Sequence, residues 1–299
     1  MNNIKRIFSI KDLENLSGIK AHTIRIWEKR YNLLSPERTD TNIRNYNLKS
    51  LQKLLNITLL YNNGFKISKI ADFSEEKIIA LAKQLVSENS IQSQAINAFK
   101  LAMVNFDQSL FLNTYTSLLN YKTFSEIFYD VFIPLLHELG LLWQTDTITP
   151  AHEHFIANLI KQKILINTEK VQLSSPTKTT QVFVLFLPEN EIHEIGLLFL
   201  NYEILLRGYQ SIYLGPNMPL DSLKELTSYY DAITFVSYFT VAPNNEKVEE
   251  YITQFNTVLN PNKTNKLWFL GRKTKDFENL SNTPHITPFT SMVDLVKKL

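Results

Sequence analysis

Short apolar runs alternate with helical patterns along the C-terminal part of the chain, and this alternation constrains the fold more than any other feature. The apolar runs have the length and composition of buried strands and lie at 182–187, 211–214, 232–237, 267–270 and 285–289. Helical patterns occupy 192–207, 219–229, 245–258 and 290–298. Strands that alternate with helices indicate an α/β domain with a doubly wound, five-stranded parallel sheet, which we place at residues 179–299.

A polar motif directly follows the first apolar run. It consists of Glu191, His193 and Gly196 at a carboxylate-x-His-x-x-Gly spacing. A histidine after the carboxyl end of a parallel strand can project into a ligand crevice. A neighbouring carboxylate can hold one ring nitrogen while the other binds a metal. The motif therefore makes His193 a candidate metal ligand, although a histidine at a strand end can also be simply exposed.

Apolar side chains recur at three- and four-residue spacing between residues 75 and 170, which predicts four or five helices packed as a bundle. Breaks are expected near Asn89, Asp107 and Lys122 and between Trp143 and Thr149. We place this helical domain at 77–172 and a linker at 171–179.

A second polar pattern lies at the end of the helical region, where nine residues separate Trp143 from the pair Glu153-His154. Pro150 and Glu153 are also what an ordinary helix start contains, since proline suits the first helical position and a carboxylate suits the first turn. The pattern alone leaves both interpretations open.

The N-terminal part of the chain is basic. Residues 1–72 carry 13 Lys and Arg against 6 Asp and Glu, whereas the remainder carries 18 against 23. The net charges of +7 and −5 indicate a polyanionic partner for the N-terminal module only.

The same segment has the spacing of a helix-turn-helix followed by a wing. Ser9 is placed to cap a helix through Leu16, a second helix is expected from Lys20 to Arg30, and residues 31–46 resemble a hairpin. Cations and aromatic residues share the second helix, although the alternative is a basic helical surface around a buried Trp27. The predicted DNA contacts are Lys20, His22, Thr23, Arg25, Lys29 and Arg30 on the helix and Arg38, Arg44 and Tyr46 near the wing.

The chain contains no cysteine and no long apolar run. Thiolate metal sites and iron–sulfur clusters are thereby excluded. Without a transmembrane segment, a cytoplasmic protein with no membrane partner is the expectation.

Four pieces of the N-terminal segment carry a more specific signal. They are Ile24-Arg25-x-Trp27-Glu28-x-Arg30-Tyr31, Leu34-x-Pro36-x-Arg38, Asn42-x-Arg44-x-Tyr46 and Asn63-Gly64-Phe65-x-Ile67-x-x-Ile70. With these pieces, residues 1–76 resemble the MerR-type winged-helix DNA-binding domain. Regulators of this type usually dimerise through a long helix after the domain. Because only Glu75 to Ser87 is available here, the contacts of a homo-oligomer, dimer or tetramer, are expected in the later domains.

The rest of the chain resembles the cobalamin-binding module of light-responsive MerR-type repressors, a four-helix-bundle cap followed by a flavodoxin-like domain. The matching pieces are Glu191-x-His193-x-x-Gly196, Ser237-x-Phe239 and Gly271-Arg272, together with Trp143 and Glu153-His154. The resemblance implies adenosylcobalamin as cofactor and His193 as the lower axial cobalt ligand, oriented by Glu191. It places Gly196, Ser237 and Gly271 along the cofactor's nucleotide tail, and it places Trp143, Glu153 and His154 at its upper face.

Four positions depart from that pattern. Glu191 stands where aspartate is more common, and Phe239 stands where the pattern has leucine. Arg272 replaces a glycine, where its side chain could obstruct the tail or meet the tail phosphate. Gln144 occupies a position where light-responsive members often carry a histidine, a role that His152 or His154 could take over.

The resemblance implies a DNA-binding repressor whose oligomerisation and operator binding are controlled by adenosylcobalamin and light. One alternative is a DNA-binding regulator whose α/β domain acts without cobalamin, as an oligomerisation or protein-interaction module. Another is a cobalamin-dependent enzyme partner, since the fold alone does not fix the function. We do not expect an enzyme, because no catalytic barrel is evident and the cluster of Glu189, Glu191 and Glu194 is expected to solvate a helix start.

Overall fold

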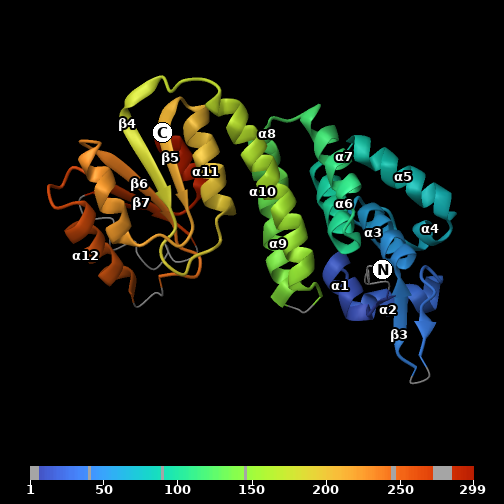
Figure 1. Cartoon of the computed structure of the whole chain (residues 1–299). Helices are drawn as coiled ribbons and strands as arrows, with labels where there is room; N and C mark the ends of the chain where they lie inside the picture. Colours follow the sequence, from blue (N-terminus) through green and yellow to red (C-terminus); the bar gives the residue numbers. More distant parts are fainter. Residues whose placement is uncertain (1–6, 40–41, 89–90, 145–146, 244–246, 272–284) are drawn as a thin grey trace. The chain divides into compact units, whose positions relative to one another are not determined.

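The structure of the protein, a computed structural model, describes residues 7–39, 42–88, 91–144, 147–243, 247–271 and 285–299. The chain divides into two compact units, residues 1–159 and residues 160–299 (Figure 1). Each unit has its own hydrophobic core and is described by itself.

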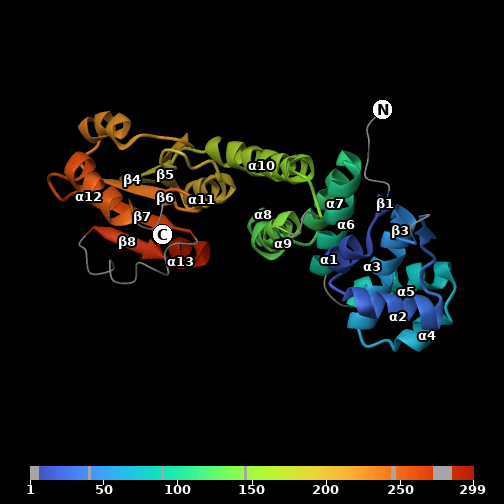
Figure 2. The same ribbon diagram turned by 90° about the horizontal axis from the view of Figure 1, so that it is seen from below.

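The first unit begins with a winged helix-turn-helix, whose short strands form an antiparallel sheet in the order β1-β3-β2. The helix α1 begins with a capping box, in which Ser9 Oγ accepts from the Asp12 N–H at 3.2 Å and the Asp12 carboxylate accepts from the Ser9 N–H at 2.7 Å. Gly18, at φ 75°, ends α1 in the left-handed conformation and turns the chain into α2. These elements lie together in Figures 1 and 2 and are β1 (Ile7–Phe8), α1 (Ile10–Ser17), α2 (Ala21–Tyr31), β2 (Glu37–Arg38), β3 (Arg44–Asn47), α3 (Leu48–Asn62) and α4 (Ile67–Ala71).

A helical bundle completes the first unit, as the three- and four-residue spacing predicts. Its helices pack around aromatic side chains, with the rings of Phe99 and Phe111 4.8 Å apart and those of Phe99 and Phe132 5.5 Å apart. The Asp107 carboxylate caps α7 and the Thr123 hydroxyl caps α8, which explains the breaks expected near Asp107 and Lys122. The break expected near Asn89 lies outside the described residues. The elements are α5 (Glu75–Glu88), α6 (Ile91–Asn105), α7 (Gln108–Leu119), α8 (Phe124–Ile127), a π-helical turn (Phe128–Phe132), α9 (Ile133–Gln144) and α10 (Pro150–Gln172), which continues into the second unit.

The second unit is a five-stranded parallel sheet in the order β5-β4-β6-β7-β8, so the predicted doubly wound sheet is confirmed. This order is that of flavodoxin-like folds. The strands are β4 (Lys178–Phe186), β5 (Tyr209–Gly215), β6 (Ile233–Tyr238), β7 (Lys266–Leu270) and β8 (Ile286–Phe289).

Helices cover both faces of this sheet (Figure 1). One face packs against α11 and α13 through a cluster that includes Leu185, Leu200 and Leu295, and the other packs against α12 through a cluster that includes Phe235 and Phe255. The predicted helix at 219–229 is a 3-10 helix at Leu220–Ser228. The helices are α11 (Ile195–Leu206), α12 (Val248–Leu259) and α13 (Met292–Lys298).

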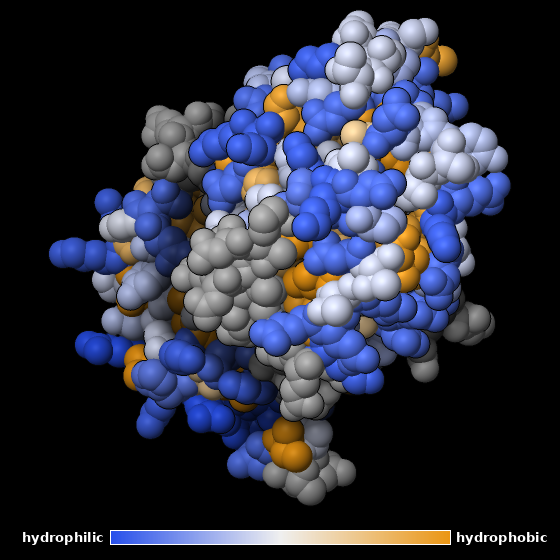
Figure 3. Space-filling view, turned by 90° about the vertical axis from the view of Figure 1, so that its left-hand side faces the viewer, coloured by the Kyte–Doolittle hydropathy of each residue, from blue (hydrophilic) through white to orange (hydrophobic). Residues whose placement is uncertain are grey.

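The face drawn in Figure 3 is mostly hydrophilic, with smaller apolar areas between the polar side chains. Among the described residues, no helix is both long enough and apolar enough to span a membrane.

The strand order places a topological switch point in the second unit, which is where sheets of this kind form a ligand crevice. β4 pairs with β5 on one side and with β6 on the other. Connections from these neighbouring strands diverge at their carboxyl ends, which is where flavodoxin-like folds bind ligands. The loop with Glu191 and His193 leaves β4 at this point, and the loop with Thr240, Val241 and Ala242 leaves β6 beside it.

Candidate functional site

Glu191 is the centre of the polar contacts at the crevice, and its side chain is fully buried. Its Oε1 accepts hydrogen bonds from the backbone N–H groups of Ile192 and His193, each at 3.0 Å. It also accepts from Nδ1 of the His193 ring at 2.5 Å. These bonds keep the chain in a loop, and α11 therefore begins at Ile195 rather than at the expected residue 192.

The second carboxylate oxygen of Glu191 reaches the neighbouring loop. Oε2 accepts from the backbone N–H groups of Thr240, Val241 and Ala242 at 3.0, 2.5 and 3.1 Å. Burial raises the pKa of this carboxyl, but the N–H donors outweigh burial and lower it to about 2. Glu191 is therefore ionised and connects the loops after β4 and β6 by hydrogen bonds. The expectation that it solvates a helix start is wrong.

The imidazole of His193 is held by one nitrogen only. Because an ionised carboxylate accepts from Nδ1, this nitrogen carries a proton, and the lone pair of the neutral ring is then on Nε2. The side chain of His193 is 53% exposed, and none of the described residues forms a hydrogen bond with Nε2. This arrangement is that of a metal-binding histidine with a carboxylate behind it.

Glu194, another acidic residue of the cluster, has contacts within the α/β unit. Glu194 accepts a hydrogen bond from the Tyr213 hydroxyl at 2.7 Å and pairs with Lys161. The described residues contain no group of three or more His, Cys, Asp or Glu side chains that could hold a metal ion. Within this part of the chain, His193 therefore offers a single ligand and no complete coordination shell.

Gly196 and Gly271 lie where backbone and rings approach closely. A Cβ on Gly196 would lie 2.8 Å from Cε2 of the Tyr238 ring. Gly271 has φ 138°, and a Cβ there would lie 2.1 Å from the carbonyl oxygen of Phe239. Gly271 is thus needed for the chain's own packing at this point, whereas a side chain at Gly196 would require the Tyr238 ring to shift.

Ser237 is fully buried at the end of β6, and its hydroxyl donates a hydrogen bond to the Phe186 carbonyl at 2.9 Å. Next to it, the Phe239 ring stacks on Phe269 at 4.9 Å and meets the Tyr251 ring edge-on at 5.6 Å. The Tyr251 hydroxyl is buried without a hydrogen-bond partner among the described residues. Sequence patterns carry no signal for Tyr238 or Tyr251, because aromatic residues in an apolar pattern are ordinary core residues.

The remaining predicted cofactor residues lie in the first unit. Trp143, in the last turn of α9, is 55% exposed. Glu153 and His154 lie in the first turn of α10, with 3.7 Å between Glu153 Oε2 and His154 Nε2. His152 is buried, stacks on Phe106 and binds Thr149 through Nδ1, so it supports the helix start. The side chain of Gln144 and all of Arg272 lie outside the described residues.

The helix α2 presents the predicted DNA-binding face. Ile24 and Trp27 are buried, and the Trp27 ring packs edge-on against Tyr61 at 5.2 Å. Arg25, Lys29 and Arg30 are exposed on the other sides of the helix. The structure therefore brings these three predicted cations together on one accessible surface.

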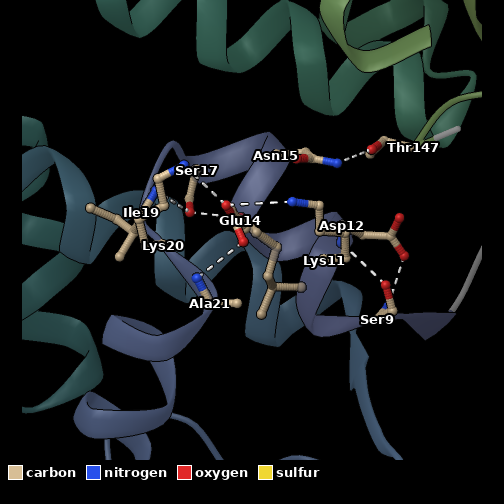
Figure 4. A network of polar contacts seen from close by, with 11 residues as sticks. Ser9, Lys11, Asp12, Glu14, Asn15, Ser17, Ile19, Lys20, Ala21 and Thr147 are labelled. Carbon is tan, nitrogen blue, oxygen red and sulfur yellow. Dashed lines mark hydrogen bonds and ion pairs between the residues drawn. The ribbon is translucent and has the colours of Figure 1, made fainter. Parts of the chain in front are cut away.

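Glu14 fixes the beginning of α2 (Figure 4). Its Oε2 accepts from the Ala21 N–H at 3.2 Å and its Oε1 accepts from Lys20 Nζ at 3.3 Å. The Ala21 N–H is the main cause of the lowered pKa of Glu14. His22 and Thr23 follow in the first turn, with 3.3 Å between His22 Nε2 and Thr23 Oγ1. Glu14 thereby connects α1 to the beginning of α2.

Glu28 holds the wing strand β3 against α2. It accepts hydrogen bonds from Arg44 Nε at 3.0 and 3.2 Å and from the Tyr46 hydroxyl at 3.0 Å. Burial, followed by the bond to Glu28, raises the pKa of Tyr46, which is only 1% exposed. Tyr46 therefore supports the wing from inside. Arg38 is exposed and donates to Asn42 Oδ1 at 2.6 Å, which keeps its guanidinium at the wing surface.

Two family profiles match the chain. The profile of the MerR HTH family regulatory proteins matches residues 8–77, and that of the B12 binding domain matches residues 95–166. These matches cover the winged helix-turn-helix and most of the helical bundle.

Two curated relatives match the chain over 70% or more of their own length. The chain is 24% identical to the HTH-type transcriptional repressor CarH of Myxococcus xanthus over 85% of this chain and 86% of that protein. It is also 24% identical to the repressor CarA of the same organism over 72% of this chain and 70% of that protein.

One solved structure is similar to this chain in fold. The monomethylamine corrinoid protein of Methanosarcina barkeri superimposes with a TM-score of 0.57 at 12% identity, over 69% of this chain and 97% of that one. The chain therefore joins a segment that matches the MerR helix-turn-helix regulators to a segment that matches the B12 binding domain, and these matches support a DNA-binding transcriptional regulator.

Proposed function

We propose that the protein is a transcriptional repressor whose oligomerisation and operator binding are controlled by cobalamin bound at His193, with adenosylcobalamin as the cofactor and light as the signal. The observation that carries the proposal is the ionised, buried Glu191 that holds Nδ1 of His193 and leaves Nε2 accessible.

The donor set suits this cofactor. One neutral imidazole without other protein ligands fits a metal that brings its remaining ligands in a macrocycle, and imidazole is a suitable ligand for cobalt. Glu191 fixes the orientation of the ring through the hydrogen bond to Nδ1. When bound, the cofactor would supply a cobalt–carbon bond that is sensitive to light. The roles of Trp143, Glu153, His154, Gly196, Ser237 and Gly271 towards the cofactor remain predictions from the resemblance.

The relatives support the proposed role as a transcriptional repressor. CarH and CarA are both named as transcriptional repressors, and the helix-turn-helix of this chain has the exposed cations that such an output needs. The partners that we propose are double-stranded operator DNA and further copies of this chain.

Absorbance spectroscopy tests the ligand assignment. Purified protein mixed with adenosylcobalamin should show a changed cofactor spectrum that survives gel filtration, and His193→Ala should abolish this complex. His22→Ala is the matched control, because this histidine lies in the DNA-binding module and should leave the complex intact. Equal binding by wild type and His193→Ala would refute the proposed ligand. Green light should then change the spectrum and release operator DNA, and a light-insensitive complex would refute the light step alone.

Contacts in the crevice favour a second candidate function. Tyr238 packs against Gly196, and the Ser237 hydroxyl donates a hydrogen bond to the Phe186 carbonyl. Both side chains therefore already have contacts within the chain. In this alternative the α/β domain acts without cobalamin as an oligomerisation or interaction module. Cofactor-free protein would then bind operator and assemble to the same size as protein incubated with adenosylcobalamin, whereas the first function predicts a difference in both.

A further inference from the structure

An aliphatic side chain lies in the middle of the cationic face of α2. Ile26 is 50% exposed, whereas Ile24 is fully buried and Trp27 is 4% exposed. Residues three and four apart are neighbours on a helix surface, so Ile26 is flanked by His22, Lys29 and Arg30. The MerR-type motif Ile24-Arg25-x-Trp27 leaves this position open, and the function described so far gives Ile26 no role.

The chemistry of the major groove restricts what such a side chain can recognise. Isoleucine has no hydrogen-bond donor or acceptor, so it cannot bind a phosphate or the polar atoms of a base edge. The apolar group that the four bases present in this groove is the C5-methyl of thymine, and aliphatic contacts to it are a known form of base readout. We infer that Ile26 reads the methyl group of a thymine in the operator, while the cations around it bind phosphates or guanine. This inference rests on DNA binding by α2.

The contacts of α2 support this assignment, because they keep the helix from turning Ile26 inward. Glu14 binds the Ala21 N–H at one end of α2, and Glu28 ties the middle of the helix to Arg44 of β3. The Trp27 ring is fixed against Tyr61 on the buried side. Ile26 is thus presented by a rigid element, as base readout requires.

Uracil substitution isolates the proposed contact. The operator is first selected from random duplexes with the full-length protein, and each thymine is then replaced in turn by deoxyuridine, which removes only the methyl group. At one or two positions the wild type should lose roughly fourfold in affinity, the effect of one buried methyl group. Ile26→Ala should lose about as much on the unmodified operator, and it should lose nothing further on the uracil operator.

Ile43→Ala is the matched control. Ile43 is also exposed, at 60%, but it lies at the wing outside α2, so this variant should keep the full penalty for uracil. Ile26→Val should remain sensitive to uracil, and unchanged circular dichroism would show that Ile26→Ala is folded. Wild-type binding that is indifferent to uracil at every position would overturn the inference, as would an Ile26→Ala variant that keeps the penalty. Failure to select any operator would contradict DNA binding itself and the inference with it.

Discussion

Glu191 keeps a negative charge inside the α/β unit because five backbone N–H groups and one imidazole nitrogen donate to it. A buried carboxylate without such donors would be neutral at pH 7. The same bonds join two loops that are separated by about fifty residues in the sequence. One residue therefore shapes the crevice and sets the tautomer of His193.

The wild type should lose folding stability in acid, partly because Glu191 becomes protonated. The pKa of Glu191 is lowered from 4.5 to about 2, so its contribution is complete above pH 4.5 and is lost as the pH falls towards 2. The difference corresponds to about 3 kcal/mol of stability. Urea unfolding followed by circular dichroism at stepped pH should show this loss in wild type and in the exposed control Glu189→Gln. The variant Glu191→Gln should be less stable at pH 7 and lack this component, and parallel pH profiles for all three proteins would contradict the assignment.

At the scale of elements, α2 and β3 are joined through Glu28, which separates the roles of two arginines. Arg25 is exposed, whereas the Arg44 side chain is 28% exposed and paired with Glu28. Arg25→Ala should leave stability unchanged and make the salt dependence of DNA binding shallower by about one unit of slope. Arg44→Ala should lower the free energy of unfolding by about 1 to 2 kcal/mol, because it leaves Glu28 mostly buried and without its cation. If urea unfolding gave equal stability for the two variants, the Arg44–Glu28 ion pair would not stabilise the contact between α2 and β3.

The end of β7 gives a second prediction at this scale. Gly271→Ala would press a methyl group onto the Phe239 backbone, which cannot move aside because the Phe239 N–H binds the Leu270 carbonyl at 2.7 Å. Gly64→Ala is the matched control, since Gly64 also has positive φ but no atom within 4 Å of the place that a methyl group would take. Thermal unfolding should show a loss of about 3 kcal/mol or more for Gly271→Ala and about 1 to 2 kcal/mol for Gly64→Ala. Similar losses would mean that backbone conformation alone requires Gly271.

These elements also show what sequence patterns can and cannot predict. The strands of the parallel sheet were predictable because buried strands are apolar runs, and the position of His193 after the first of them was predictable from its motif. Its role as a cobalt ligand stays a prediction. The hydrogen bonds from residues 240–242 to Glu191 could not be predicted, because every residue except proline has a backbone N–H and the residue types therefore give no signal. Tyr46 was predicted as a DNA contact, but it is buried and bound to Glu28, which a motif does not reveal. Arg44 is partly exposed and stays a predicted DNA contact.

At the scale of the whole molecule, DNA binding and the proposed cofactor ligand belong to different compact units. The DNA-binding helix lies in residues 1–159 and His193 lies in residues 160–299. Control of one by the other is therefore a coupling free energy between two sites, and such coupling is reciprocal. If adenosylcobalamin raises operator affinity by some factor in the dark, operator DNA must raise adenosylcobalamin affinity by the same factor.

This reciprocity gives the last prediction. Operator affinity would be measured with and without saturating adenosylcobalamin, and cofactor affinity with and without saturating operator, all in the dark at one salt concentration. Typical couplings of about 1 to 3 kcal/mol correspond to changes of roughly 5- to 150-fold, and the two measurements should agree. His193→Ala should reduce the effect of the cofactor on operator binding to none, while its cofactor-free operator affinity stays at the wild-type value. Tight cofactor binding with a factor of one in both directions would show that the α/β unit binds cobalamin without controlling DNA.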